Sequence, residues 1–328
     1  MKTFDKIEGD LLSICIPTYN RASYLDKCLQ SLTENLDNYG FPIYISDNFS
    51  EDGTEAVVNY YQKSYSKIVY KKNKTNMGLY LNILNVIDMA KSEYVWLMGD
   101  DDAILPSSIE RVLSKILEGN DYIVVNAIPY DINLEHAKSE RIINCREDKR
   151  YGEGESKNLL VDLKKWAYHG FISSMIIKRE LLLPIAKKYR ESSFPLYNNI
   201  WFLLALFYEA IAHKSGVFVC DPVVMNRDNP RASGKNFWNY MFIDHLKALE
   251  YIGSEGYAFV NMSDFLKVID VIFIATISKH KDPNTILLNE YLKKNKSFPF
   301  YLKLLLQFVD ITPKFLIDNL NDLIYKLK

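Results

Sequence analysis

Three consecutive aspartates, Asp100, Asp101 and Asp102, follow an apolar run that ends at Met98 and precede Pro106. The run predicts a buried strand, and apolar residues at helical spacing after the proline predict a helix. The acids therefore lie at the carboxyl end of a strand, where open α/β sheets bind ligands. Neighbouring carboxylates repel one another unless a cation joins them, and Mn²⁺ or Mg²⁺ bridging to phosphate is the natural partner. The alternative is a solvated acidic turn.

Strand and helix patterns alternate before this point and just after it. Strands are predicted at 11–16, 41–47, 67–71, 93–98 and 121–126. The first helix between them has Leu25, Cys28, Leu29 and Leu32 on one face, and the others begin near Thr54, Asn76 and Pro106. Strands that alternate with short helices are joined by right-handed crossovers, so the sheet is predicted to be mainly parallel and the fold class to be α/β.

The rest of the chain is less regular. A long polar loop region is predicted at 127–160, strands at 171–178 and 216–220, a mobile polar loop at 226–237, and helices after Trp238. This pattern divides the chain into a ligand-binding domain of residues 1–237 and a helical C-terminal region of residues 238–328.

Net charge, cysteine spacing and the lengths of the apolar segments limit the classes of protein to which the chain could belong. The 328 residues carry a formal net charge of −1, without the basic footprint that nucleic-acid binding usually leaves. The cysteines Cys15, Cys28, Cys145 and Cys220 form no CxxC pair, which favours buried free thiols in a reducing compartment. The N-terminal residues lack the apolar core of a signal peptide, and no apolar stretch is long enough to span a bilayer. We therefore expect a cytoplasmic protein.

Four short polar segments follow the predicted strands and converge on one edge of the sheet. They are Pro17-Thr18-Tyr19-Asn20-Arg21, the stretch from Asp47 to Thr54, Asn76-Met77-Gly78, and the acid triplet. The glycine signatures of dinucleotide-binding sites and of P-loops are both absent from the sequence.

In this order, with this strand spacing, the four segments resemble those of the family 2 glycosyltransferases of the GT-A fold. The resemblance covers residues 11–126 well and continues weakly to about residue 235. It implies a mainly parallel, mixed sheet flanked by helices, and a helical C-terminal extension. It also implies a nucleotide-diphosphate-sugar donor, with a UDP-sugar favoured, and transfer to an acceptor hydroxyl with inversion at the anomeric carbon.

The resemblance also implies roles for single residues. Thr18 and Asn20, with their neighbours Pro17, Tyr19 and Arg21, would line the nucleotide pocket, Asp47 would bind the base, and Asn76 and Gly78 would border the base and ribose. Asp101 matches the principal ligand of a Mn²⁺ or Mg²⁺ ion, Asp100 assists at the ribose or metal, and Asp102 completes the paired acids as a second metal ligand. The family's usual Asp-x-Asp-Asp has lost its first acid, because Gly99 stands there.

Inversion by direct displacement needs a general base near the acceptor hydroxyl. Many relatives use an aspartate ahead of a helix in the second half, but residues 194–201 contain no acid. The candidates are His169 and Asp228, and we favour His169 because histidine titrates near neutral pH. The alternative for His169 is a structural histidine. Arg227 and Arg231 favour an ion-pair role for Asp228 and could clamp the diphosphate.

The C-terminal third combines apolar helical faces with an excess of lysine. That combination suits peripheral contact with an anionic membrane and a lipid-linked saccharide acceptor, but it also suits a helical cap or a homodimer partner.

The sequence therefore predicts an inverting, metal-dependent glycosyltransferase of bacterial surface-polysaccharide synthesis. The alternative is a catalytically silent carbohydrate-binding or scaffold protein. A sugar-1-phosphate nucleotidyltransferase is disfavoured, because residues 11–21 contain no glycine for a phosphate loop.

Overall fold

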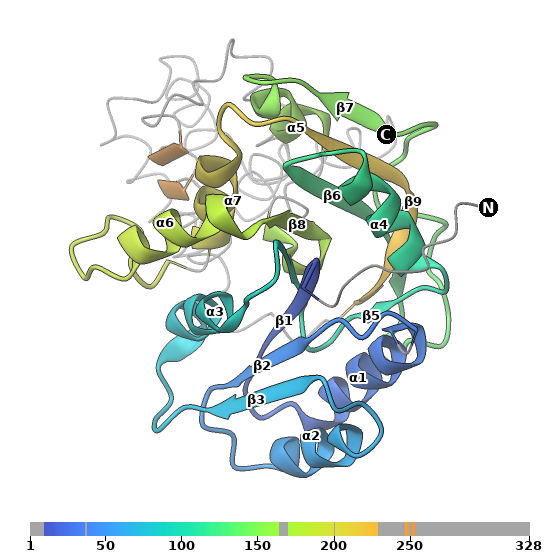
Figure 1. Cartoon of the computed structure of the whole chain (residues 1–328), viewed down its shortest axis with the longest axis vertical. Helices are drawn as coiled ribbons and strands as arrows, with labels where there is room; N and C mark the ends of the chain where they lie inside the picture. The colour runs from blue at the N-terminus through green and yellow to red at the C-terminus, as the bar shows by residue number, and fades with distance from the viewer. Residues whose placement is uncertain are drawn as a thin grey trace, which may run out of the picture.

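The described part of the chain forms an α/β fold around one mixed sheet of nine strands (Figure 1). The computed structural model describes residues 10–36, 38–163, 170–199, 201–228, 247–248 and 251–252. Its strands are β1 (Leu12–Thr18), β2 (Ile43–Asp47), β3 (Ile68–Lys72), β4 (Tyr94–Leu97), β5 (Ala103–Ile104), β6 (Tyr122–Tyr130), β7 (Lys149–Tyr151), β8 (Met175–Lys178) and β9 (Gly216–Arg227). Its α-helices are α1 (Ala22–Leu36), α2 (Thr54–Gln62), α3 (Gly78–Met89), α4 (Ser108–Leu117), α5 (Ser156–Asp162), α6 (Arg179–Tyr189) and α7 (Phe202–Ile211).

The strand order is β3-β2-β1-β4-β8-β6-β9-β5, and β7 pairs with β9. Strands β1 to β4 are mutually parallel, whereas β8 runs antiparallel to both β4 and β6. Because β6 and β9 are parallel to each other, their carboxyl ends return to the same edge as those of β1 to β4. The α/β class and the mixed sheet that the sequence predicted are confirmed.

Strands β1, β2 and β4 are buried on both faces, which explains why they read as nearly continuous apolar runs, whereas β3 at the edge of the sheet is largely exposed. In β1, Leu12, Ile14 and Ile16 pack into the core under α1, α2 and α4, while Cys15 points to the opposite core under α3, α6 and α7. Figure 1 shows α1 and α2 on one side of the blue strands and α3 on the other. The period-2 geometry of a strand thus feeds two hydrophobic layers.

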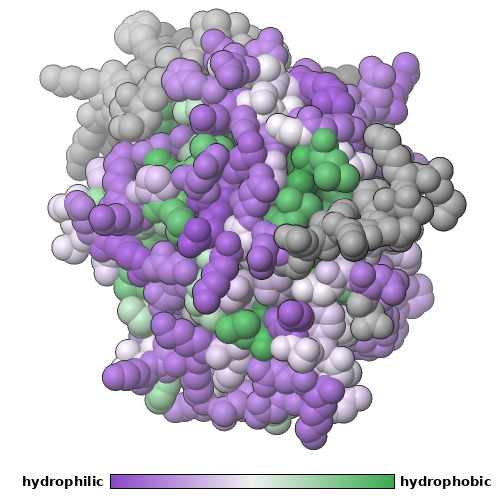
Figure 2. Space-filling model, in the orientation of Figure 1, coloured by the Kyte–Doolittle hydropathy of each residue, from purple (hydrophilic) through white to green (hydrophobic). Residues whose placement is uncertain are grey.

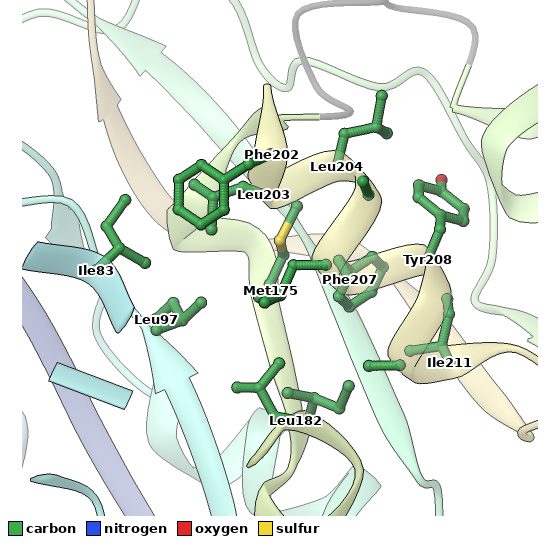
Figure 3. Close-up of a cluster of buried hydrophobic side chains, with 14 of the residues drawn as sticks. Ile83, Leu97, Met175, Leu182, Phe202, Leu203, Leu204, Phe207, Tyr208 and Ile211 are labelled. Carbon is green, nitrogen blue, oxygen red and sulfur yellow. The ribbon is translucent and has the colours of Figure 1, made fainter. Parts of the chain in front are cut away.

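The core that contains Cys15 includes α7, a helix that is apolar almost all round. Figure 3 shows its residues Phe202 and Phe207 among side chains from other elements, including Ile83 of α3 and Leu97 of β4. Burial of each large side chain contributes about 1.5–3 kcal/mol. This layer therefore fixes the position of β8, which carries Met175, against the first half of the sheet.

The stretch predicted as a long loop is partly regular. Strand β6 continues to Tyr130, and β7 and α5 occupy residues 149–151 and 156–162. Conversely, only residues 175–178 of the predicted strand 171–178 are extended, because a 3₁₀ turn precedes them. Residues 226 and 227 of the predicted loop at 226–237 belong to β9, which extends to Arg227 through its pairing with β6, and residues 229–237 lie outside the described residues. The predicted division between residues 237 and 238 lies outside the described residues.

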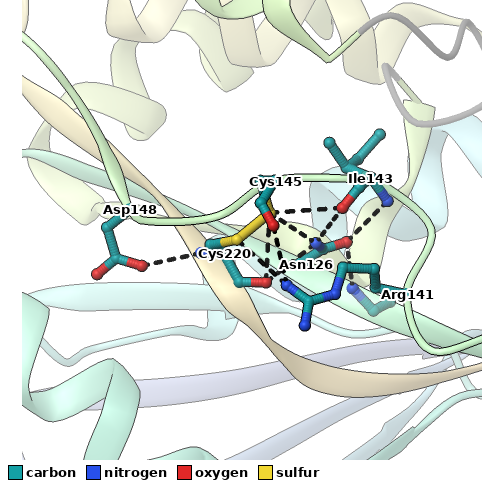
Figure 4. Close-up of a disulfide and its surroundings, with 7 residues drawn as sticks. Asn126, Arg141, Ile143, Cys145, Asp148 and Cys220 are labelled. Carbon is teal, nitrogen blue, oxygen red and sulfur yellow. Dashed lines mark hydrogen bonds between the residues drawn. A yellow bond between two sulfur atoms is a disulfide. The ribbon is translucent and has the colours of Figure 1, made fainter.

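One expectation about the cysteines is wrong. Cys145 and Cys220 form a disulfide with their Cα atoms 5.8 Å apart, whereas Cys15 and Cys28 are buried free thiols as predicted. Figure 4 shows the bridge joining the segment before β7 to the middle of β9, next to the amide of Asn126. The two cysteines are 75 residues apart in sequence, and the antiparallel pairing of β7 with β9 brings the segment that carries Cys145 beside Cys220.

Hydrophilic residues cover most of the lower half of the face shown in Figure 2, with apolar residues in small separate patches. Within the described part of the chain, no helix has the length and apolar character needed to cross a bilayer.

Candidate active site

The polar segments predicted to meet do meet, at the carboxyl edge of the parallel strands. Thr18 ends β1, Asp47 ends β2 and Lys72 ends β3, and the register pairs Thr18 with Asp47 and Asp47 with Lys72. Pro17 and Thr18 belong to β1 and are buried, whereas Tyr19 emerges beyond the strand and is exposed. The acid triplet follows β4, the neighbour of β1.

The turns after β1 and β2 are locked together by reciprocal hydrogen bonds. The Asn20 backbone N–H donates to Ser50 Oγ at 2.8 Å, and the Glu51 N–H donates to Asn20 Oδ1 at 2.8 Å. The Asp52 carboxylate accepts from the Ala22 N–H at 2.9 Å, at the start of α1. Asn20 therefore acts in this structure as a tie between two turns, and it takes the left-handed conformation with φ of 51°.

Asp47, the predicted base-binding acid, lies beneath the surface of this edge. Its exposed fraction is 0%, one oxygen accepts from the Ser50 N–H at 2.8 Å, and the other accepts from the Tyr70 hydroxyl. These bonds hold the turn that follows β2 and tie it to β3. A direct contact with a base would require one of them to be exchanged.

The third segment is fastened to the second through Asn48. The Asn48 side-chain Nδ2 donates to Asn76 Oδ1 at 2.7 Å, and the Asn48 side-chain Oδ1 accepts from the Met77 N–H at 2.8 Å. Asn76 Oδ1 also accepts from the N–H of Gly78, whose φ of 80° suits glycine. Asn76 and Gly78 thus form the turn that begins α3 at the same edge.

The three aspartates differ sharply in their surroundings. Asp100 is 5% exposed, and it accepts from Thr18 Oγ1 at 2.7 Å and from Arg21 Nη1 at 2.9 Å. Asp101 accepts from the same Arg21 Nη1 at 2.8 Å, and 24% of its side chain is exposed. Asp101 is therefore the acid of the triplet with an accessible carboxylate.

Electrostatics follow this arrangement. Burial raises the pKa of Asp100 to about 6, against the lowering effect of the Arg21 charge. Burial and then the charge of Asp101 raise the pKa of Asp102 to about 7, although its hydrogen bonds favour the ionised form. Burial opposes the charge of Arg21, but Asp100 and Asp101 outweigh it and raise the arginine's pKa. The guanidinium is the cation that joins this acid pair here.

Asp102 points into the protein. It is 2% exposed, and it accepts from Ser173 Oγ, from the Asn226 amide at 3.1 Å and from the Arg227 backbone N–H at 3.0 Å. Its role in this structure is to fix the acid turn to the end of β9 and to the turn before β8. The sequence analysis missed Ser173 and Asn226, because no local pattern marks residues whose partner is 71 or 124 positions away.

Gly99 explains the missing first acid of the family motif. A Cβ built there would lie 3.1 Å from Asp101 Oδ1, 3.2 Å from Asp102 Oδ2 and 3.3 Å from Ser173 Oγ. The Gly99 N–H also donates to Ser173 Oγ at 2.8 Å. A side chain at this position would require the two carboxylates and the hydroxyl to shift by a few tenths of an ångström.

Arg227 is a second cation at the acid turn, and it is only 7% exposed. Its Nε donates to the Asp101 carbonyl at 2.7 Å, and its guanidinium carbon lies 4.8 Å from the ring centre of Tyr24. The guanidinium carbon of Arg21 lies 5.4 Å from the same ring. The ring of Tyr24 thus supports both arginines beside the acids. Arg231 lies outside the described residues.

Only one of the two candidates for the general base is among the described residues. His169 lies outside the described residues. Asp228 directly follows β9, its side chain is 53% exposed, and it pairs with Lys138. Residues 194–199 form turns that precede α7, in which Asn199 Oδ1 accepts from the Trp201 N–H at 2.7 Å.

Among the described residues, no group of three or more His, Cys, Asp or Glu side chains is arranged to hold a metal ion. The donor set nevertheless suits Mg²⁺ or Mn²⁺. Such ions bind proteins through one or two carboxylates and take their other ligands from water and substrate phosphates. Asp101 offers an accessible carboxylate oxygen, and Asp100 lies beside it on the same guanidinium.

Residues 13–182 match the sequence model of glycosyl transferase family 2, which is about half of the chain. The chain belongs to this family. It is 40% identical over 101 residues to the abequosyltransferase RfbV of Salmonella typhimurium, a match that covers 30% of each chain. It is 33% identical over 118 residues to a GalNAc(5)-diNAcBac-PP-undecaprenol β-1,3-glucosyltransferase of Campylobacter jejuni, covering 36% of this chain and 38% of that one. The chain thus matches about a third of the length of these two relatives.

Solved structures support the same fold. The S. aureus TarS fragment 1–349 in complex with UDP-GlcNAc superposes with a TM-score of 0.60 at 14% identity, covering 86% of this chain and 81% of that one. The mannosyltransferase PcManGT of Pyrobaculum calidifontis, in complex with GDP-Man and Mn²⁺, gives a TM-score of 0.50 at 13% identity, covering 89% of this chain and 78% of that one. The fold of the chain is the GT-A glycosyltransferase fold.

Proposed function

We propose that this protein is an inverting, metal-dependent glycosyltransferase that moves a sugar from a nucleotide-diphosphate-sugar to an acceptor hydroxyl in bacterial surface-polysaccharide synthesis. The observation that carries the proposal is the accessible carboxylate of Asp101, held beside Asp100 by Arg21 at the carboxyl edge of a GT-A sheet. Ligands of open α/β sheets bind at this edge.

The donor would lie across the ends of β2, β1 and β4. Tyr19 and the turns tied by Asn20 and Asn76 would border the base and ribose, with Asp47 supporting them from below. A UDP-sugar is favoured, and the UDP-GlcNAc complex of the structural neighbour TarS supports that choice.

The diphosphate would lie over the acid turn. Asp101, assisted by Asp100, would hold Mn²⁺ or Mg²⁺, which offsets the charge that develops on the leaving nucleoside diphosphate. Arg21 would exchange its carboxylate partners for phosphate oxygens, since a guanidinium fits both geometries. Asp102 would keep the turn in place, as its three donors from β9 and the turn before β8 indicate.

The acceptor hydroxyl would give up its proton to a base from the second half of the chain. We favour His169 over Asp228, because the pairing of Asp228 with Lys138 commits its carboxylate to an ion pair. The acceptor would be a saccharide, and the undecaprenol in the name of the C. jejuni relative supports a lipid-linked one. The proposal also includes a cytoplasmic location, peripheral contact of residues 238–328 with the membrane, and a homodimer.

The decisive experiment is a donor panel. UDP-, GDP-, CDP- and dTDP-sugars are incubated with the protein and Mn²⁺, and both the melting temperature and the release of nucleoside diphosphate are measured. A transferase that binds its donor gains stability by mass action and hydrolyses the donor slowly in the absence of acceptor. A scaffold protein that has lost chemistry gives neither metal-dependent stabilisation nor release, and that result would refute the proposal.

A further inference from the structure

Phe49 occupies a backbone conformation that an aromatic residue rarely adopts. Its φ is 71°, in the left-handed region where glycine and asparagine are the usual occupants. A bulky side chain there costs conformational energy and persists only where the surroundings fix the backbone. Such strain gathers at ligand sites, so the position of the ring is a feature to be explained.

The surroundings do fix this backbone. The N–H of Asn48 donates to the Thr18 carbonyl at 2.9 Å, which joins the residue before Phe49 to β1. The N–H of Ser50 donates to the buried Asp47 carboxylate at 2.8 Å, which holds the residue after it. Phe49 is thus pinned on both sides and has no freedom to relax into an ordinary turn.

The ring lies outside the core, near the end of β3. Phe49 is 39% exposed, and the Lys72 ammonium at the end of β3 lies 6.0 Å from the ring centre. Tyr19 at the end of β1 is 42% exposed, and Met77 at the start of α3 is 40% exposed. An aromatic and apolar rim therefore surrounds the interlocked turns.

The distance to the acid turn suits one kind of ligand. Strand β2 is separated from β4 by β1 alone, so the two strand ends lie about 10 Å apart at the usual strand spacing. Ribose and two phosphates extend over a comparable length. A diphosphate on Asp101 would bring the attached planar base to the rim that carries Phe49.

We infer that Phe49 is a further donor-binding residue whose ring stacks on the base of a nucleoside diphosphate bound with its phosphates at Asp101. This inference deepens the proposed function and rests on it. The strain at Phe49 is then the cost of holding an aromatic surface where glycine would otherwise relax the turn.

The test uses Phe49→Gly, which removes the ring and the left-handed strain together. Titration calorimetry with UDP and Mn²⁺ is expected to show affinity reduced about 5- to 150-fold, the equivalent of about 1–3 kcal/mol of stacking. Affinity for inorganic pyrophosphate with Mn²⁺, which has no base, is expected to stay unchanged. The melting temperature is expected to stay the same or rise by up to about 4 °C. Phe49→Trp, which keeps an aromatic ring, should retain most of the UDP affinity.

Tyr60→Ala is the matched control, because Tyr60 is an exposed aromatic (65%) in the last turn of α2, away from this edge. It should leave both affinities unchanged. If Phe49→Gly binds UDP as tightly as the natural chain, or loses pyrophosphate affinity equally, the inference is overturned while the proposed function stands. If the natural chain binds no nucleoside diphosphate with Mn²⁺, the proposed function and this inference fall together.

Discussion

In the β1–β4 half of the sheet, the polar residues of the ligand edge bond to one another from adjacent turns, as Asn20 does with Ser50 and Asn48 with Asn76. In the β6–β9 half, they bond back to the acid turn of the first half, as Asn226 and Arg227 do with Asp102. The first half therefore supplies the turns of the ligand surface and most of the bonds among them. The second half holds the acid turn of that surface through hydrogen bonds to Asp102, and it would supply the general base that acts on the acceptor.

This difference predicts which step each half controls. Variants in the first half should weaken donor binding. Variants in the second half that leave the acid turn intact should spare donor binding and slow transfer.

The largest expected effect concerns the base in the second half. His169→Ala should reduce transfer at saturating donor and acceptor by about 10²–10⁴-fold, because a general base contributes that much. Donor affinity, measured by calorimetry, should not change. Asp228→Ala is the comparison, and its loss should be smaller because Asp228 pairs with Lys138. A His169 variant within a few-fold of the natural rate would exclude His169.

In the first half, Asp101→Ala should reduce turnover by at least about 100-fold and remove the metal dependence of nucleotide binding. The fold should survive, because part of the Asp101 carboxylate is exposed and Arg21 keeps its bond to Asp100. Glu118→Ala is a suitable control, since it removes an acid that pairs with Lys115 and Arg150 at the end of α4. Near-normal activity of Asp101→Ala would contradict the assignment.

Asp47 tests whether the first half holds its ligand directly or through its turns. Asp47→Ala deprives the Ser50 N–H and the Tyr70 hydroxyl of their acceptor, which should lower the free energy of unfolding by on the order of 2–4 kcal/mol. Nucleotide affinity should fall with it, because the turn loosens. Tyr70→Phe, which removes one of the two bonds, should show a smaller loss of both.

The alternative is distinguishable by denaturant titration. If Asp47→Ala retains native stability and yet loses nucleotide, the carboxylate contacts the base directly, as the sequence predicted. Unchanged nucleotide affinity would mean that Asp47 serves neither purpose.

The two halves also differ in how far their structure could be predicted from sequence. The first half was predictable because each polar segment directly follows an apolar strand, so that strand order alone brings Thr18, Asp47 and Asp101 to one edge. The accessibility of single carboxylates was not predictable, since the burial of Asp102 depends on Ser173 and on the end of β9. The Cys145–Cys220 bridge escaped prediction for the same reason, because it depends on a pairing between distant strands.

The smallest expected effect is a pH dependence that originates where the halves meet. Asp102 has a folded-state pKa of about 7, above the usual value near 3.8, because it is buried and lies beside the charge of Asp101. The folded chain therefore retains a proton that the unfolded chain releases, and its stability falls as the pH rises between about 4 and 7. Between pH 5 and pH 8 in EDTA, the free energy of unfolding should fall by roughly 3 kcal/mol from this group. Asp102→Asn removes the ionisation and should flatten the slope, whereas Glu118→Gln should not. If the slope is unchanged in Asp102→Asn, the hydrogen bonds from β9 and Ser173 offset the burial of the ionised carboxylate, and the pKa of Asp102 is not raised by folding. The second half would then hold the acid turn without lowering the stability of the folded chain.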